Sequence, residues 1–154
     1  MSSATPHIPE GFRPIPNISG FIGINGPLYL RHVVRETGDL VHIGFRVEER
    51  HTNPMNNCHG GMLATFCDML LPLSIHRLSK AVGHRFLPTI NLQIDYLAPC
   101  PLGSWVQGEV QVLRVTRSLV FAQALVHADS TPAVRASGIF KIGPPFAGAE
   151  EPIG

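Results

Sequence analysis

Charged residues are scarce in this sequence of 154 residues, because Asp, Glu, Lys and Arg together make only 15% of it, against roughly 25% in an average soluble domain. The 12 basic and 11 acidic residues nearly cancel and leave a formal net charge of +1. A chain this neutral lacks the basic surface that binds nucleic acid or an anionic membrane, so we expect neither as a partner. Since apolar residues still make 44% of the chain, we expect a second copy of the chain to cover part of its surface.

Long hydrophobic runs and paired cysteines are also missing. No apolar run reaches the length of a membrane-spanning helix, and residues 1–16 have neither the basic start nor the apolar centre of a secretion signal. Cys58, Cys67 and Cys100 are odd in number and form no CxxC pair. These features predict reduced thiols and a cytoplasmic protein.

Proline and glycine gather near the two ends and predict the domain limits. Four prolines within residues 1–17 predict a flexible, extended arm. Residues 143–154, GPPFAGAEEPIG, are expected to form a flexible tail. A single domain is therefore predicted between them, over residues 18–142.

Hydrophobic patterning within this domain predicts one helix and at least five strands. Residues 60–78 are apolar nearly all round, which is typical of a buried helix. Alternating or valine-rich segments predict strands at 40–50, 89–97, 105–116, 118–129 and 133–142. Short turn signals separate the last three, so the expected fold class is α+β, with an antiparallel sheet wrapped around one central helix.

Polar residues and glycines cluster at the start of the predicted helix. Gly60 and Gly61 open the helix, where free N–H groups can approach a substrate closely and stabilise negative charge on an oxygen atom. Asp68 follows inside an apolar stretch, where a carboxylate is costly unless it is partnered or takes part in chemistry. A hydrogen bond to a nearby hydroxyl or backbone group would also account for Asp68.

Helix geometry limits how these groups can cooperate. Eight residues separate Gly60 from Asp68, so they lie about 12 Å apart along the helix axis. The two groups of one chain therefore cannot contact the same carbonyl group. If both act on one substrate, Gly60 must come from one chain and Asp68 from another, which requires a dimer.

The sequence resembles the hotdog-fold acyl-CoA thioesterases, in particular their phenylacetate-pathway (PaaI-like) branch. The resemblance rests on the motif Asn53-x5-His59-Gly60-Gly61-x6-Asp68 and on segment 89–99, TINLQIDYLAP, and it covers about residues 20–142. It implies the hotdog fold, hydrolysis of an acyl-CoA to a free acid and CoA, no cofactor, and dimers that join their sheets edge to edge. Many relatives pair such dimers into tetramers.

The resemblance also implies a role for each matching residue. Asp68 corresponds to the carboxylate that activates water or attacks the thioester carbonyl, and the Gly60 N–H corresponds to the group that polarises that carbonyl. Asn53 and His59 correspond to residues that position the thioester or the water. Thr89 lies where relatives carry a Ser or Thr that holds the water near the Asp.

Two departures from the family pattern affect local structure. Asn56 replaces a usual glycine, and we expect the turn to survive because Asn tolerates a left-handed backbone. Pro72 removes an N–H that would bond the Asp68 carbonyl, so we expect a kinked or loosened helix and an altered acyl pocket.

Substrate contacts are less specifically marked. Gly61 is expected to lie against the substrate, and Arg117 is our choice for a CoA phosphate contact among Lys80, Arg85, Arg114, Arg117 and Arg135. The apolar segment containing Phe21, Ile22, Pro27 and Leu28 is a candidate for the acyl pocket.

Other functions remain open on sequence alone. The spacing of His59 and Asp68 puts them on opposite helix faces and no HExxH or CxxC motif is present, so no metal site is expected. The alternatives are a non-catalytic acyl-CoA-binding dimer and an enoyl-thioester hydratase or dehydratase of the same fold.

Overall fold

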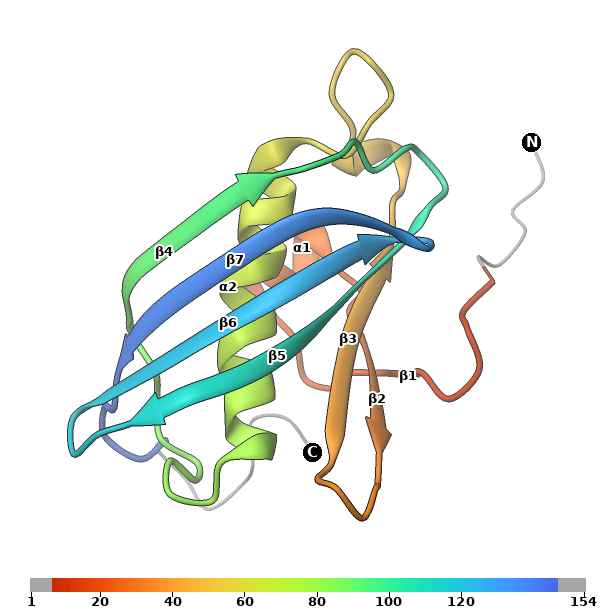
Figure 1. The fold of residues 1–154 in the computed structure, drawn as a ribbon. Helices are drawn as coiled ribbons and strands as arrows, with labels where there is room; N and C mark the ends of the chain where they lie inside the picture. Colours follow the sequence, from red (N-terminus) through yellow and green to blue (C-terminus); the bar gives the residue numbers. More distant parts are fainter. Residues whose placement is uncertain (1–6, 147–154) are drawn as a thin grey trace.

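The computed structural model describes residues 7–146 and shows one antiparallel sheet curled around a long helix (Figure 1). In chain order the elements are β1 (Arg13–Pro14), α1 (Gly20–Asn25), β2 (Tyr29–Val33), β3 (Leu40–Arg46), a 3-10 helix (Glu49–His51), α2 (Gly60–Leu78), β4 (Thr89–Tyr96), β5 (Trp105–Val115), β6 (Leu119–Ala128) and β7 (Thr131–Lys141). The predicted α+β fold is therefore confirmed. The sheet has seven strands, two more than the five that the sequence predicts. The two additional strands, β1 and β2, were not predicted.

The strand order places β4 at an edge of the sheet. The order is β1-β2-β3-β5-β6-β7-β4, so β4 joins β7 although it precedes β5 in the sequence. One side of β4 is therefore left without a partner strand within the described chain. Ile90 and Tyr96 on this strand are 57% and 55% exposed, which is unusual for large side chains of a sheet and marks β4 as a surface open to another chain.

The hydrophobic core lies between α2 and the concave face of the sheet. Phe66, Leu70, Leu71 and Ile75 of α2 are fully buried, as the all-round apolar pattern predicts. A Cβ atom at Gly108 of β5 would lie 2.3 Å from the Leu70 Cδ2 atom. Glycine is thus required there for α2 to approach the sheet.

Helix α2 continues through Pro72 from Gly60 to Leu78. The expected loosening at Pro72 is not visible as an interruption, because buried residues on both sides, including Leu71 and Leu73, hold the helix against the core. The lost hydrogen bond at the Asp68 carbonyl is the local cost of this proline.

Parts of the predicted arm and tail are packed against the domain. Phe12 and Ile15 are buried, and Arg13–Pro14 pairs with β2, so the prolines of the arm do not prevent regular structure. A proline is compatible with β1 because this strand lies at the outer edge of the sheet, where a backbone N–H group is not needed to pair with a further strand. The rest of the expected arm and tail, residues 1–6 and 147–154, lies outside the described residues.

Predicted strand ends differ from the observed ends mainly at β3. The segment expected to continue to residue 50 leaves the sheet after Arg46. The Glu48 N–H donates to His51 Nδ1 over 3.0 Å, which starts the 3-10 helix and ends the strand.

Candidate active site

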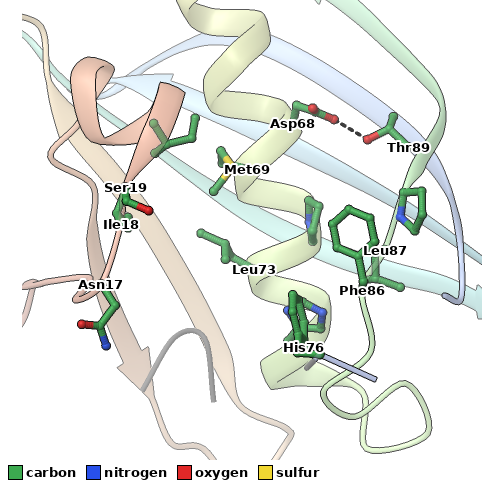
Figure 2. A pocket seen from close by; sticks show the side chains of 14 residues that line it. Asn17, Ile18, Ser19, Asp68, Met69, Leu73, His76, Phe86, Leu87 and Thr89 are labelled. Carbon is green, nitrogen blue, oxygen red and sulfur yellow. Dashed lines mark hydrogen bonds between the residues drawn. The ribbon is translucent and has the colours of Figure 1, made fainter. Parts of the chain in front are cut away.

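The side chains of Asp68 and Thr89 meet at the middle of α2 and the first residue of β4. The Thr89 hydroxyl donates a hydrogen bond of 2.6 Å to Asp68 Oδ1 (Figure 2). Asp68 is half-buried, and Thr89 is exposed. Within residues 7–146, no hydrogen bond to the other oxygen, Oδ2, is found, so this oxygen is available to bind and activate a water molecule.

An apolar cavity of about 390 Å³ opens beside this pair. It lies between the segment before and within α1, one face of α2, and the segment that enters β4 (Figure 2). Besides Asp68 and Thr89, its lining consists of Asn17, Ile18, Ser19, Ile22, Met69, Pro72, Leu73, His76, Phe86, Leu87, Pro88 and Phe146. A cavity of this size and character suits a mostly apolar ligand.

Hydrogen bonds organise the N-terminus of α2. His59 Nδ1 accepts the Gly61 N–H over 2.8 Å and so caps the helix. The Tyr96 hydroxyl of β4 donates to the Gly60 carbonyl over 2.7 Å. No acceptor for the Gly60 N–H is found in residues 7–146, as expected for the first N–H of a helix. The Gly61 N–H is therefore engaged by His59 in this structure, and Gly60 provides the free donor.

Asn53 organises the loop that precedes α2. Its Oδ1 atom accepts the N–H groups of Met55 and Asn57, over 3.0 and 3.2 Å, in a turn of the type that Asn favours. Asn56 adopts the left-handed conformation with φ of 60°, as predicted from the missing glycine. The side-chain carbonyl of Asn53 is thus occupied, and its amide N–H groups remain for contacts outside the loop.

The single chain does not bring all predicted site residues together. Asn53, His59, Gly60 and Gly61 lie at the N-terminus of α2, whereas Asp68 and Thr89 lie two turns further along the helix.

Arg117 lies in the turn between β5 and β6 and is exposed. That turn is at the end of the sheet where β4 begins, since Leu119 pairs with Lys141 and the Lys141 N–H donates to the Pro88 carbonyl.

The three cysteines of this chain are all buried as free thiols. Burial raises the pKa of the Cys58 and Cys67 thiols to about 12 and that of Cys100 to about 11. These thiols are protonated at neutral pH and are therefore poor nucleophiles. Among the described residues, no group of three or more His, Cys, Asp or Glu side chains is placed to hold a metal ion.

The carboxylate was found by sequence analysis, but most of the residues that line this cavity were not. Of the four residues suggested for the acyl pocket, Ile22 lines the cavity, while Phe21 is 66% exposed and Leu28 belongs to the core. Pro27 lines a different depression. The spacing of Asp68, Met69, Pro72, Leu73 and His76 along one helix face was the signal that could have found the α2 side of the cavity. Tyr96 was also missed as a site residue, although it lies in the segment that carries the family resemblance.

One antiparallel sheet curled around one long central helix is the architecture of the hotdog fold. Residues 55–134, just over half of the chain, match the family model described as the thioesterase superfamily. The chain belongs to this superfamily and is a thioesterase.

Relatives and solved structures agree with this assignment. A Pseudomonas aeruginosa protein whose name describes it as an esterase, PA0474, is 27% identical over 88% of this chain and 98% of its own length. Mouse acyl-coenzyme A thioesterase 13 is 26% identical over 90% of this chain and 94% of its own. The crystal structure of zebrafish thioesterase superfamily member 2 has a TM-score of 0.62, with 25% identity, over 74% of this chain and 81% of that one.

A variant of the phenylacetic acid degradation protein PaaI from Thermus thermophilus has a TM-score of 0.61 at 17% identity, over 79% of this chain and 96% of that one, and shares the fold. The predicted hotdog fold is confirmed by these structures. No helix in the described part of the chain is long and apolar enough to cross a membrane.

Proposed function

We propose that this protein hydrolyses acyl-CoA thioesters to a free acid and CoA, at a site shared by two subunits. The observation that carries the proposal is the 2.6 Å bond from Thr89 to Asp68 at the edge of an apolar cavity. This arrangement places a carboxylate beside a space for an acyl group. The relatives named acyl-coenzyme A thioesterase 13 support CoA as the leaving group.

Asp68 activates the attacking water or attacks the carbonyl itself. With Oδ1 held by Thr89, Oδ2 is free to accept a proton from water. The hydroxide equivalent adds to the thioester carbonyl, the C–S bond breaks, and the thiol of CoA leaves with a proton. In the alternative route, Oδ2 attacks the carbonyl carbon, the C–S bond breaks, and CoA leaves as a thiolate, so that a mixed anhydride remains on Asp68. Water then hydrolyses the anhydride, which restores the Asp68 carboxylate and releases the free acid and a proton that the thiolate takes up.

Charge on the carbonyl oxygen is stabilised by the Gly60 N–H of a second copy. Within one chain, Gly60 and Asp68 are about 12 Å apart along α2, too far to act on one carbonyl group. Two copies related by a twofold axis bring each N-terminus towards the other copy's carboxylate. The unpaired edge of β4, which carries Thr89 and Tyr96, is the surface that we assign to this dimer.

The remaining predicted residues take supporting roles around this centre. His59 holds the Gly61 N–H and thereby fixes the orientation of the neighbouring Gly60 N–H. The Asn53 amide group, whose carbonyl is already bound by the loop, donates towards the thioester or the water. Arg117, exposed at the end of the sheet where β4 begins, contacts a phosphate of CoA.

Release of CoA tests the proposal directly. A panel of aliphatic and aromatic acyl-CoAs is incubated with the protein, and free CoA is followed with a thiol reagent. Asp68→Asn keeps the shape of the site and is expected to lower kcat by about a thousandfold or more. Asp39→Asn is the matched control, because Asp39 is an exposed carboxylate between β2 and β3 that bonds to His32, away from both the cavity and β4.

Circular dichroism and size-exclusion chromatography must show that both variants keep the native fold and oligomer. Tight binding of acyl-CoA without hydrolysis by the wild-type protein would instead identify a binding module.

A further inference from the structure

The cavity beside Asp68 extends along one face of α2. It passes Met69 and Leu73 and reaches His76 (Figure 2). Eight residues at a rise of about 1.5 Å place His76 about 12 Å further along the helix axis than Asp68. An acyl chain whose carbonyl lies at Asp68 is therefore directed towards His76.

Three rings form the far end of this path. The ring centroids of His76 and Phe146 are 5.9 Å apart, and those of Phe86 and Phe146 are also 5.9 Å apart, in both cases edge to face. This geometry is the favourable one for aromatic pairs. All three rings line the cavity, so Phe146 stands between two partners as part of its wall.

His76 contributes an uncharged ring to this wall, and its Nε2 atom is occupied by a backbone carbonyl. Its Nε2 atom lies 2.7 Å from the Arg85 carbonyl oxygen, which can only accept, so Nε2 carries the proton and donates it. Burial lowers the pKa of His76 below its usual value, and its ring is uncharged at pH 7.

Backbone hydrogen bonds fix the segment that carries Phe146. The Gly143 N–H donates to the Phe86 carbonyl over 2.8 Å, and the Phe86 N–H donates to the Pro144 carbonyl over 3.0 Å. The Phe146 N–H donates to the His84 carbonyl over 3.3 Å. The segment after β7 is thus tied to the segment before β4, and the ring of Phe146 has a defined place.

We propose that Phe146 sets the acyl-chain length of this enzyme, and that its preferred substrates carry unbranched acyl chains of medium length. This inference rests on the proposed thioesterase function and specifies its substrate class. A path of about 12 Å accommodates about eight to ten carbons in an extended chain. Longer chains meet the ring of Phe146.

The lining between the carboxylate and the rings favours an aliphatic chain over an aryl group. Ile18, Ile22, Met69 and Leu73 line this stretch, and all four are aliphatic or thioether side chains. A chain contacts them along the whole path, whereas a single aryl ring next to the carbonyl leaves the far part unfilled. Each methylene that enters the path contributes about 0.8 kcal/mol, or about fourfold in kcat/KM.

The test measures kcat/KM for straight-chain acyl-CoAs from four to sixteen carbons, and for aryl acyl-CoAs, with the full-length protein. We expect a rise of about fourfold per methylene up to eight to ten carbons, and no further rise beyond. Phe146→Ala moves this maximum towards longer chains by about two to four carbons, and Phe146→Trp moves it towards shorter ones. Leu113→Ala removes an exposed apolar side chain outside the cavity and leaves the profile unchanged.

Several results would overturn the inference while hydrolysis itself stands. One is a maximum of kcat/KM at the same chain length in the wild type, Phe146→Ala and Phe146→Trp. The others are a kcat/KM that rises continuously up to sixteen carbons and a higher kcat/KM for aryl than for straight-chain acyl-CoAs. If Phe146→Ala does not fold, Phe146→Leu replaces it, with a smaller shift expected.

Failure of the proposed function gives a different pattern. If the wild-type protein hydrolyses no acyl-CoA, the affinities of S-alkyl-CoA thioethers of increasing length are measured by calorimetry. A maximum at eight to ten carbons that shifts in Phe146→Ala supports Phe146 as the length determinant without catalysis. A profile that is flat or unshifted overturns the inference as well.

Discussion

Thr89 binds Asp68 through a hydrogen bond of 2.6 Å from its hydroxyl to Oδ1, and this bond joins the edge strand β4 to the middle of α2. The bond fixes Oδ1 of Asp68 and leaves Oδ2 available to bind water or a substrate. It also connects the proposed catalytic group to the strand that we assign to the dimer interface. Both residues lie on one chain, so this half of the proposed two-chain site is complete within a single copy.

Removing the Thr89 hydroxyl is expected to lower kcat with little change in stability. Hydrogen bonds to charged groups contribute about 1.5–3 kcal/mol, so Thr89→Val should lower kcat by about 10- to 100-fold. Thr89→Ser keeps the hydroxyl and should retain most of the activity. Steady-state kinetics on one acyl-CoA compares the two variants, and equal losses in Val and Ser would contradict a role for the hydroxyl.

Mixing two inactive variants tests whether each site uses two chains. Gly60→Pro removes the N–H, and proline is accepted at the first position of a helix, where its Cβ atom would lie in ordinary contact with Tyr96, at 3.4 Å. Asp68→Asn and Gly60→Pro should each be inactive alone. After unfolding and refolding together in equal amounts, half of the dimers are mixed and each has one intact site, so about a quarter of the wild-type activity returns.

Recovery must depend on mixing before refolding, and the two variants refolded separately provide the control. A site complete within one chain would give no recovery under either condition.

The sequence predicted those parts of the molecule whose signals are local or periodic. Helix Gly60–Leu78 was predicted with its observed ends, and β5, β6 and β7 within two residues of theirs, because long apolar patterns fix both type and extent. The left-handed backbone of Asn56 was anticipated through the family resemblance, because relatives carry a glycine at this position and Asn tolerates that conformation.

Features that depend on contacts distant in sequence were not predictable. Helix α1 has six residues, no buried side chain and no side-chain cap, so nothing in its sequence marks it. Phe146 follows a Gly- and Pro-rich stretch that was interpreted as a free tail, and its place is set by bonds to residues about sixty positions earlier. The proximity of Thr89 to Asp68 was anticipated only through the family resemblance, and their direct hydrogen bond was not predicted, because 21 residues separate them.

Tyr96 is expected to position the N-terminus of α2. Its hydroxyl donates to the Gly60 carbonyl over 2.7 Å, next to the N–H that we assign to the oxyanion. Tyr96→Phe removes about 0.5–1.5 kcal/mol of hydrogen bonding and should lower kcat by about three- to tenfold while KM changes less. Tyr29→Phe is the matched control, because the Tyr29 ring packs on Trp105, in a different part of the sheet. A change confined to the melting temperature would identify Tyr96 as merely structural.

His51 is expected to make stability depend on pH below neutrality. It is 2% exposed, its Nε2–H donates to the Asn25 carbonyl over 2.6 Å, and its Nδ1 accepts the Glu48 N–H. A second proton would have to enter at Nδ1 and break the bond to Glu48. Burial accordingly lowers the pKa of His51 from its usual value of 6.5.

The direction of the effect follows from proton binding. Below pH 6.5 the unfolded chain takes up a proton on this histidine before the folded chain does, so acid favours unfolding. The contribution of His51 to the stability of the fold is complete above the pKa that this histidine has in the unfolded chain. It is lost as the pH falls towards the lower pKa of the folded chain. The melting temperature should therefore decrease from pH 7.5 to pH 5.5.

His76, whose pKa is lowered in the same direction by burial, adds to this slope. At pH 7.5, His51→Gln should be less stable than the wild type, because the variant lacks the neutral histidine ring. Its melting temperature should depend less steeply on pH than that of the wild type. Asp39, whose pKa is lowered by a hydrogen bond from His32, loses its contribution only below about pH 4, outside this window. Equal slopes in the wild type and His51→Gln would show that the ring of His51 is not the group that titrates.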